Sequence, residues 1–454
     1  MREKLSSRLG FILLSAGCAI GIGNVWRFPY VTGQSGGGLF VLLYLLFLAA
    51  LGIPVLVMEF AVGRAAQRSV ATAHAALTPE RTAWRLHGIA GLAGNVLLMM
   101  FYTTVAGWMT LYFLKTAAGA FVGMNPDEIG AAFGAMLDDP VRQAAAMACV
   151  CIGSAAVCAI GLQKGLERVT KWMMLALLLL IVVLAANSVC LDGAGRGLRF
   201  FLLPDASRLE SVGVMTVVAN AMNQAFFTLS LGIGAMTIFG SYIDRGRSLL
   251  GEAAHVAVLD TFVALCAGLI VLPACFAFGV EPGQGPGLVF VTLPNVFNRM
   301  PCGRLWGALF FLFMSFAALT TVLAVFENIV ACLTDYTGWS RRRTCWLVGI
   351  ALVALSLPCV LGFSLWTAFH PLGAGSNVLD LEDFVVSDIL LPLGSLAFAL
   401  YCTHRFGWGW KAFRTEANTG RGPCIPEGLR AYCAWVLPSV ILLIFILGLV
   451  RRFS

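Results

Sequence analysis

Hydrophobic residues fill long stretches of this chain, and polar residues collect in the short segments between them. Eleven apolar stretches approach or exceed the length of about 20 residues that lets a helix cross a bilayer. Their approximate limits are 9–31, 38–62, 89–118, 143–160, 166–188, 211–242, 250–279, 304–335, 343–362, 383–404 and 429–449. The pattern predicts an all-α polytopic membrane protein.

Two of these stretches are interrupted by residues that a lipid-facing helix would not carry. Residues 15–30 read SAGCAIGIGNVWRFPY, with three glycines, an asparagine, an arginine and a proline. The centre of stretch 211–242 reads NQAFFTLSLGIGAM. Irregular backbone is tolerated at membrane depth only where protein buries it or where it lines a cavity. Both segments therefore predict broken helices of the kind that form transporter sites.

The two breaks fall at corresponding positions of two five-span halves, which indicates an inverted repeat. We expect residues 1–200 to form the first repeat (spans 1–5) and residues 201–410 the second (spans 6–10). Residues 411–454 would then add a loop and an eleventh helix.

Composition narrows the class of protein further. The chain is 59% apolar and only 12% charged, which excludes an ordinary soluble domain. Its net charge of +7 does not indicate nucleic-acid binding, because the basic residues lie in short loops between apolar stretches. A cytoplasmic N-terminus places most of them inside, as the positive-inside rule requires. We therefore expect a multi-pass protein of the cell's inner (plasma) membrane.

Cysteine and histidine give no sign of metal or redox chemistry. Most of the 14 cysteines lie within apolar stretches, and no CxxC pair occurs, so we interpret them as small buried apolar residues. The five histidines are scattered, and no HExxH motif or nucleophile elbow is present. An enzyme is therefore not predicted.

Several long motifs resemble the neurotransmitter:sodium symporter family. They are GNVWRFPY, GGGLFVLLYLLFLAALGIPVLVMEFAVGR, QAFFTLSLGIGAM and FAALTTVLAVFENIVACLTD, in this order along nearly the whole chain. Eleven spans are typical of a prokaryotic branch that transports hydrophobic or aromatic amino acids. The resemblance implies a five-plus-five inverted-repeat fold with helices 1 and 6 broken, and sodium-coupled symport by alternating access.

Two Na⁺ sites follow from the resemblance, and hydroxyl, amide, carboxylate and carbonyl oxygens suit such a hard cation. Site 1 would take the Ala19 carbonyl, Asn24, Thr228, Asp260 and the substrate carboxylate. Site 2 would take the carbonyls of Gly17, Ile20 and Ala317 with Thr320 and Thr321. Threonines in membrane helices also bond to their own helix, but the preceding FAAL favours the ligand interpretation.

Asp260 is the most informative single residue, because a carboxylate in mid-span is costly unless it has a function. Chloride-dependent relatives carry asparagine here and bind Cl⁻ among residues matching Tyr44, Gln224 and Thr228. One chloride-independent subgroup has a glutamate one turn later, where this chain has Ala264. We expect Asp260 to supply the negative charge itself, so that no chloride is needed. A protonated aspartate that only hydrogen-bonds a neighbour is the alternative.

The resemblance also implies a substrate pocket, in which Tyr102 and freed N–H groups at Ile22 and Gly23 bind the substrate carboxylate. The implied lining residues are Ala19, Ile22, Gly23, Leu98, Tyr102, Phe227, Ser230, Ile233, Thr321 and Val325. None is acidic, and Gly21 stands where amine-transporting relatives place an aspartate. We therefore expect a neutral apolar or aromatic L-amino acid as the small-molecule partner.

Two gates are implied on either side of this pocket. Arg27 and Asp383 would pair above Phe227, and Arg2 and Asp335, helped by Tyr242 and Glu327, would close the cytoplasmic side. Glu59 is expected to hydrogen-bond the unwound backbone of span 6. In span 5, Leu175 replaces a proline that many relatives carry ten residues after the glycine at Gly165, which leaves the unwinding of that span open.

Three alternatives to transport remain at this level. A sensor that keeps the binding site without turnover is one. A symporter of another sodium-coupled family with the same fold is another, although it should lack the WRFPY segment. An integral membrane enzyme is the third. Lipid is the only other partner expected, a monomer suffices for function, and the sequence leaves the preferred amino acid, the Na⁺ stoichiometry, proton antiport and the oligomeric state open.

Overall fold

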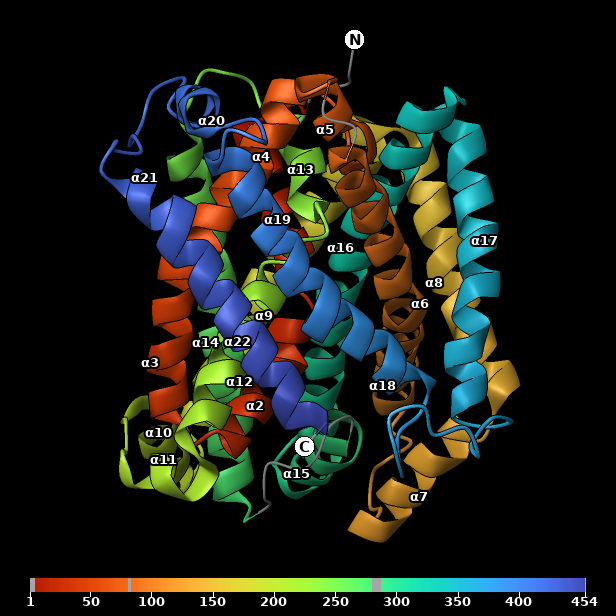
Figure 1. Cartoon of the computed structure of the whole chain (residues 1–454). Coiled ribbons are helices and arrows are strands. Elements are labelled where there is room, and N and C mark those ends of the chain that lie inside the picture. The colour runs from red at the N-terminus through yellow and green to blue at the C-terminus, as the bar shows by residue number, and fades with distance from the viewer. Residues whose placement is uncertain (1–4, 81–82, 280–286, 454) are drawn as a thin grey trace.

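The computed structural model describes residues 5–80, 83–279 and 287–453. Every secondary-structure segment of several residues in these ranges is a helix. One isolated β-bridge joins Arg247 to Arg421. Most helices run roughly along one axis (Figure 1). The described start of the chain lies at one end, here named the N-side, together with α5 and α20. The C-terminal end of α22 lies at the opposite end, the C-side, with α7, α10, α11 and α15 (Figure 1).

Nine helices in the described part of the chain are long and apolar enough to cross a membrane. Each covers one of the predicted apolar stretches, which confirms the polytopic α-helical class. Their bounds are Gly38–Ala66 (α3 Gly38–Phe47 and α4 Ile53–Ala66), Trp84–Ala117 (α6), Pro140–Ile160 (α8), Leu162–Val189 (including α9, Arg168–Val189), Leu249–Ala277 (α14), Gly303–Thr337 (α16), Arg341–Gly362 (α17), Val378–Thr403 (α18 Val378–Asp383 and α19 Leu391–Thr403) and Leu429–Val450 (α21 Leu429–Ala431 and most of α22, Leu437–Phe453).

The first predicted break occurs between α1 (Arg8–Ala19) and the helical segment Gly23–Gln34, which contains α2 (Phe28–Gln34). The two parts are bent by 55° and together form a tenth candidate span. Ile20 leaves the helix with φ −73° and ψ 95°, so the α-helical hydrogen bonding of α1 stops there. Helical bonding resumes with a π-helical turn at Gly23–Arg27.

The second predicted break separates α12 (Val214–Thr228) from α13 (Ala235–Gly240). The turn between them has positive φ at Ser230, Gly232 and Gly234. Glycine adopts this conformation without penalty, which explains why a Gly-x-Gly segment ends the helix here. This pair occupies the place of the sixth of the eleven predicted spans.

Shorter helices cap the two ends of the molecule. Their bounds are α5 Val70–Leu77, α7 Pro126–Leu137, α10 Ala194–Leu202, α11 Ser207–Val212, α15 Leu293–Arg299 and α20 Trp410–Ala417. Within the long spans, further π-helical turns occur at Leu48–Gly52, Leu162–Glu167, Phe384–Leu390 and Tyr432–Val436, and one precedes α15 at Leu288–Thr292.

The core of the protein contains charged groups as well as apolar ones. Glu59, Arg64, Asp260 and Glu327 are all completely buried, although each lies on a helix of spanning length. A charge at such depth is expensive and must be partnered. The groups that contact these four residues therefore indicate where to look for a functional site.

Candidate functional site

A small cavity lies where the two broken helices meet. It leaves about 20 Å³ of room for a water-sized molecule in this conformation. Its walls come from both breaks and from α6, α16 and the span that contains α19. The lining residues are Cys18, Ala19, Gly21, Gly23, Leu98, Tyr102, Phe227, Ser230, Ile233, Thr321, Val386 and Leu391. None of them is acidic, so the cavity offers no negative side chain to a cationic ligand.

Most of the residues predicted to line a substrate pocket lie around this cavity. Val325 and Ile22 do not line it, but the backbone N–H of Ile22 donates to the Tyr102 hydroxyl, 2.7 Å away. Tyr102 therefore accepts a hydrogen bond from the broken helix and keeps its own hydrogen for another acceptor. Gly21 lies directly against it, because a Cβ at Gly21 would overlap the Tyr102 hydroxyl.

A cluster of oxygen atoms surrounds the Thr321 hydroxyl. It lies 3.1 Å from the carbonyl oxygen of Gly17, 3.2 Å from that of Ile20 and 3.4 Å from that of Ala317, with the Cys18 carbonyl at 3.5 Å. Thr320 lies next to it and donates to Phe316 or Ala317. One hydroxyl proton cannot serve four carbonyls at once. The surplus of oxygen acceptors fits a monovalent cation, and all the residues predicted for site 2 take part.

The second predicted cation site is a buried network around Asp260. The Asn24 amide nitrogen donates to Asp260 Oδ1 at 2.8 Å, and the Thr228 hydroxyl donates to Oδ2 at 2.8 Å. The Asn24 carbonyl oxygen accepts the Gly21 N–H at 3.3 Å. Asn24, Thr228 and Asp260 are each completely buried. The carboxylate and its two partners thus form a compact, mostly oxygen donor set beside the first break, which fits Na⁺, and Ala19 lies at that same break.

Phe227 and Arg27 cover the cavity on one side. The Phe227 ring lies so close to the backbone that a Cβ at Gly23 would be 2.5 Å from it. The guanidinium carbon of Arg27 lies 4.4 Å from the centre of this ring. Among the described residues, no salt bridge joins Arg27 to Asp383, whose carboxylate accepts from Ser387 at 2.5 Å. The predicted Arg27–Asp383 pair is therefore not formed in this conformation.

The N-side of the molecule is closed by a different set of contacts. The Tyr242 hydroxyl donates to Glu327 at 2.7 Å, and Arg341 donates to the same carboxylate at 2.8 Å. Asp335 accepts the backbone N–H of Ser69 at 2.7 Å. The predicted partner of Asp335, Arg2, lies outside the described residues. No sequence pattern distinguishes Arg341, which stands in a run of three arginines.

The start of the chain is tied to two acidic residues on other spans. The Ser6 hydroxyl donates to Glu167 at 2.6 Å, and Arg8 forms a salt bridge of 3.0 Å with Glu252. These contacts hold the N-side end of α1 against the starts of α9 and α14. Neither acidic residue was singled out by sequence reasoning.

Glu59 fixes the turn between α12 and α13. Its carboxylate accepts the backbone N–H groups of Gly232 at 2.6 Å and of Met236 at 3.2 Å, which is the contact expected from the sequence. At Gly232 the backbone of the same turn approaches the backbone of α19 closely, because a Cβ there would overlap the Leu391 carbonyl. The position of the turn is therefore set on both sides.

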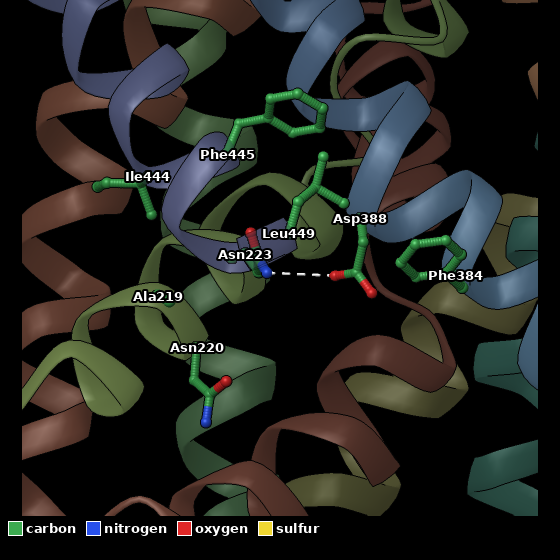
Figure 2. A pocket seen from close by; sticks show the side chains of 9 residues that line it. Ala219, Asn220, Asn223, Phe384, Asp388, Ile444, Phe445 and Leu449 are labelled. Atoms are coloured by element: carbon green, nitrogen blue, oxygen red, sulfur yellow. Dashed lines mark hydrogen bonds between the residues drawn. The ribbon is translucent and has the colours of Figure 1, made fainter. Parts of the chain in front are cut away.

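A second cavity lies between α12, the turn Phe384–Leu390 and α22, with an empty volume of about 880 Å³. Asn220, Asn223 and Asp388 supply its polar groups, and Asn223 donates to Asp388 at 3.3 Å (Figure 2). Phe384 and Leu449 provide apolar surface. No residue predicted for substrate, ion or gate lines this cavity.

Comparisons with known proteins agree with this geometry. The profile described as "Sodium:neurotransmitter symporter family" matches residues 2–122 and 133–451. The sodium-dependent transporter YhdH of Bacillus subtilis is 37% identical over 87% of this chain and 86% of its own length. The sodium- and chloride-dependent GABA transporter ine of Drosophila melanogaster is 24% identical over 99% of this chain and 51% of its own.

A solved structure is similar over nearly the whole chain. The crystal structure of MhsT in complex with L-phenylalanine is 36% identical to this protein and has a TM-score of 0.89. The similarity covers 98% of this chain and 99% of that one. It confirms the predicted inverted-repeat transporter fold with broken helices 1 and 6.

Proposed function

The chain belongs to the sodium:neurotransmitter symporter family, whose members are sodium-coupled transporters and not enzymes, and we propose that it carries neutral hydrophobic or aromatic L-amino acids without chloride. The observation that carries this proposal is the composition of the central cavity. It lacks an acidic side chain, yet it lies against Tyr102, a broken helix and two clusters of oxygen atoms whose chemistry suits a cation.

The substrate carboxylate supplies the negative charge that the cavity walls lack. It lies beside the first break, where the Tyr102 hydroxyl and backbone N–H groups donate to it. There it also completes the oxygen donor set of Asn24, Thr228 and Asp260 around the first Na⁺. Substrate and ion therefore bind together, because each offsets part of the charge of the other.

The side chain of the substrate occupies the apolar part of the cavity. Leu98, Ile233 and Leu391 form this part, and Phe227 covers it. In this conformation the walls nearly fill the cavity and leave about 20 Å³, room for about one water molecule, so they must move apart to admit a substrate side chain. The crystallised neighbour MhsT holds L-phenylalanine, which supports a substrate of this class.

A second Na⁺ binds between α1 and α16, at the Thr321 cluster. The carbonyls come from the broken helix and the hydroxyl from α16, so the ion joins an element that moves in alternating access to one that stays fixed. Asp260 replaces chloride as the fixed negative charge. The proposed protein thus binds two Na⁺ ions and no chloride. It lies in the plasma membrane with its N-terminus in the cytoplasm, and a monomer is sufficient for function.

Uptake into proteoliposomes tests the proposal. We expect L-phenylalanine, L-tryptophan or L-leucine to accumulate when an inward Na⁺ gradient is imposed, and tryptamine to be ignored. Counterflow of labelled substrate separates a transporter from a sensor that only binds. Equal accumulation with choline in place of Na⁺ would refute sodium coupling, and Na⁺-dependent uptake of tryptamine alone would refute the substrate class.

A further inference from the structure

An open pocket surrounds α20 on the N-side, far in sequence from the broken helices. Its empty volume is about 1600 Å³. Its polar lining is dominated by basic residues, namely Arg405, Lys411, Arg414 and Arg430. Two acidic residues, Glu416 and Glu427, also line it.

Both acidic residues are already neutralised by other contacts. Arg64 and Arg245 bind Glu416 at 2.7 Å and 3.0 Å, and neither arginine lines the pocket. Glu427 binds Arg414 at 3.1 Å. Among the ion pairs of the described residues, none involves the other three cations, which are all exposed. These three, Arg405, Lys411 and Arg430, are named the basic pocket.

Apolar surface adjoins the basic pocket along the chain. Phe406 follows Arg405 and Leu429 precedes Arg430, and both side chains are more than two-fifths exposed. Trp435 is 68% exposed, and the centre of its ring lies 5.2 Å from the centre of the His404 ring. Exposed aromatic residues at the start of a spanning helix are typical of the membrane interface. Arg430 itself lies at the start of the span Leu429–Val450.

We propose that the basic pocket binds an anionic phospholipid. Arg405, Lys411 and Arg430 hold the phosphate of the headgroup, and the acyl chains lie along Phe406, Leu429 and Trp435. Basic pockets at the ends of membrane helices bind anionic headgroups in this way. The apolar flank favours a lipid over a soluble phosphate ester, because a soluble ligand would leave that surface unused.

Native mass spectrometry of the purified full-length protein in detergent tests lipid retention directly. Dioleoyl phosphatidylglycerol is titrated against dioleoyl phosphatidylcholine, which has the same acyl chains, and sn-glycerol 3-phosphate serves as the soluble ester. The test variant is Arg405→Gln/Lys411→Gln/Arg430→Gln. The matched control, Lys164→Gln/Arg168→Gln/Arg342→Gln, removes three exposed charges at the starts of other helices on the N-side.

We expect the native protein and the control to retain phosphatidylglycerol at least tenfold better than phosphatidylcholine. Each charge removed from the basic pocket should weaken retention about fivefold. Equal loss in test and control variants would overturn the proposal, as would equal retention of the two lipids. Binding of sn-glycerol 3-phosphate as tight as that of the lipid would assign the pocket to a soluble ligand instead.

Folding of the variants is checked by their thermal unfolding in lipid-free detergent, which should match that of the native protein. If the triple variant fails to fold, the exposed Lys411→Gln change alone still tests the proposal through its fivefold effect. The readout is independent of transport, so its failure would leave the proposed function intact.

Discussion

Replacing Asp260 by asparagine should make transport depend on chloride. The change is isosteric and keeps a carbonyl oxygen to accept from Thr228 or Asn24, so the buried network loses charge rather than shape. The native protein should take up substrate equally well in chloride and in gluconate. The variant should lose most activity in gluconate and recover part of it when Cl⁻ is added.

The size of the effect follows from the geometry of the network. Both carboxylate oxygens of Asp260 lie 2.8 Å from side chains proposed to bind the first Na⁺. Unit charges about 4 Å apart attract by about 4 kcal/mol at an effective dielectric constant of about 20, and each 1.4 kcal/mol corresponds to a factor of about ten. Because the asparagine dipole retains some attraction, we expect the Na⁺ affinity in gluconate to fall by about 100- to 1000-fold.

The assay is Na⁺-dependent substrate binding and uptake in proteoliposomes, with chloride varied at constant ionic strength. Glu59→Gln is the matched control, because Glu59 is an equally buried carboxylate that holds backbone rather than a proposed ion ligand. The control should impair transport without creating a response to chloride. A several-fold rise of native uptake with chloride, or a chloride response in both variants, would refute the role given to Asp260.

Three further substitutions test other parts of the site. Tyr102→Phe removes a donor to the substrate carboxylate, so the KM for amino acids should rise at least tenfold. It also leaves the buried Ile22 N–H without its acceptor, so the free energy of unfolding should fall by about 1–3 kcal/mol. An unchanged KM would refute the contact. Arg27→Ala should slow uptake at least tenfold with little loss of stability, because the guanidinium covers Phe227 and is held by no salt bridge among the described residues. A large drop in the unfolding temperature would assign Arg27 to folding instead. Gly232→Ala, at φ 98°, should destabilise the protein by at least about 2 kcal/mol, whereas Gly130→Ala, with open space around it, should be neutral or slightly stabilising. Equal unfolding temperatures of these two variants would contradict the tight contact at Gly232.

The breaks in spans 1 and 6 could be predicted because glycine and polar residues conflict locally with an apolar helix. Leu391 could not be assigned to the cavity, because a uniformly apolar span does not reveal which of its faces points inward. The apolar stretch around Cys18 predicts a packing role for it, and only the backbone bend brings it to the cavity.

Arg64 and Arg341 both fall outside the predicted apolar stretches, yet Arg64 is buried against Glu416 and Arg341 binds Glu327. Such pairs depend on how distant helices pack. The spacing of the residues along the chain carries no signal for them.

The contact of Gly232 with Leu391 also bears on how this protein's selectivity can evolve. There the backbone of Gly232 meets the backbone of Leu391, so a side chain at position 232 cannot be accommodated without displacing a helix. The next residue is different, because Ile233 lines the cavity and packs on Gly94, where a Cβ would lie 2.6 Å from the Ile233 side chain. A smaller residue at 233 leaves room for a larger one at 94, and the reverse exchange is equally simple. Close relatives that differ in substrate size should therefore differ at positions 94 and 233 together, while position 232 stays glycine.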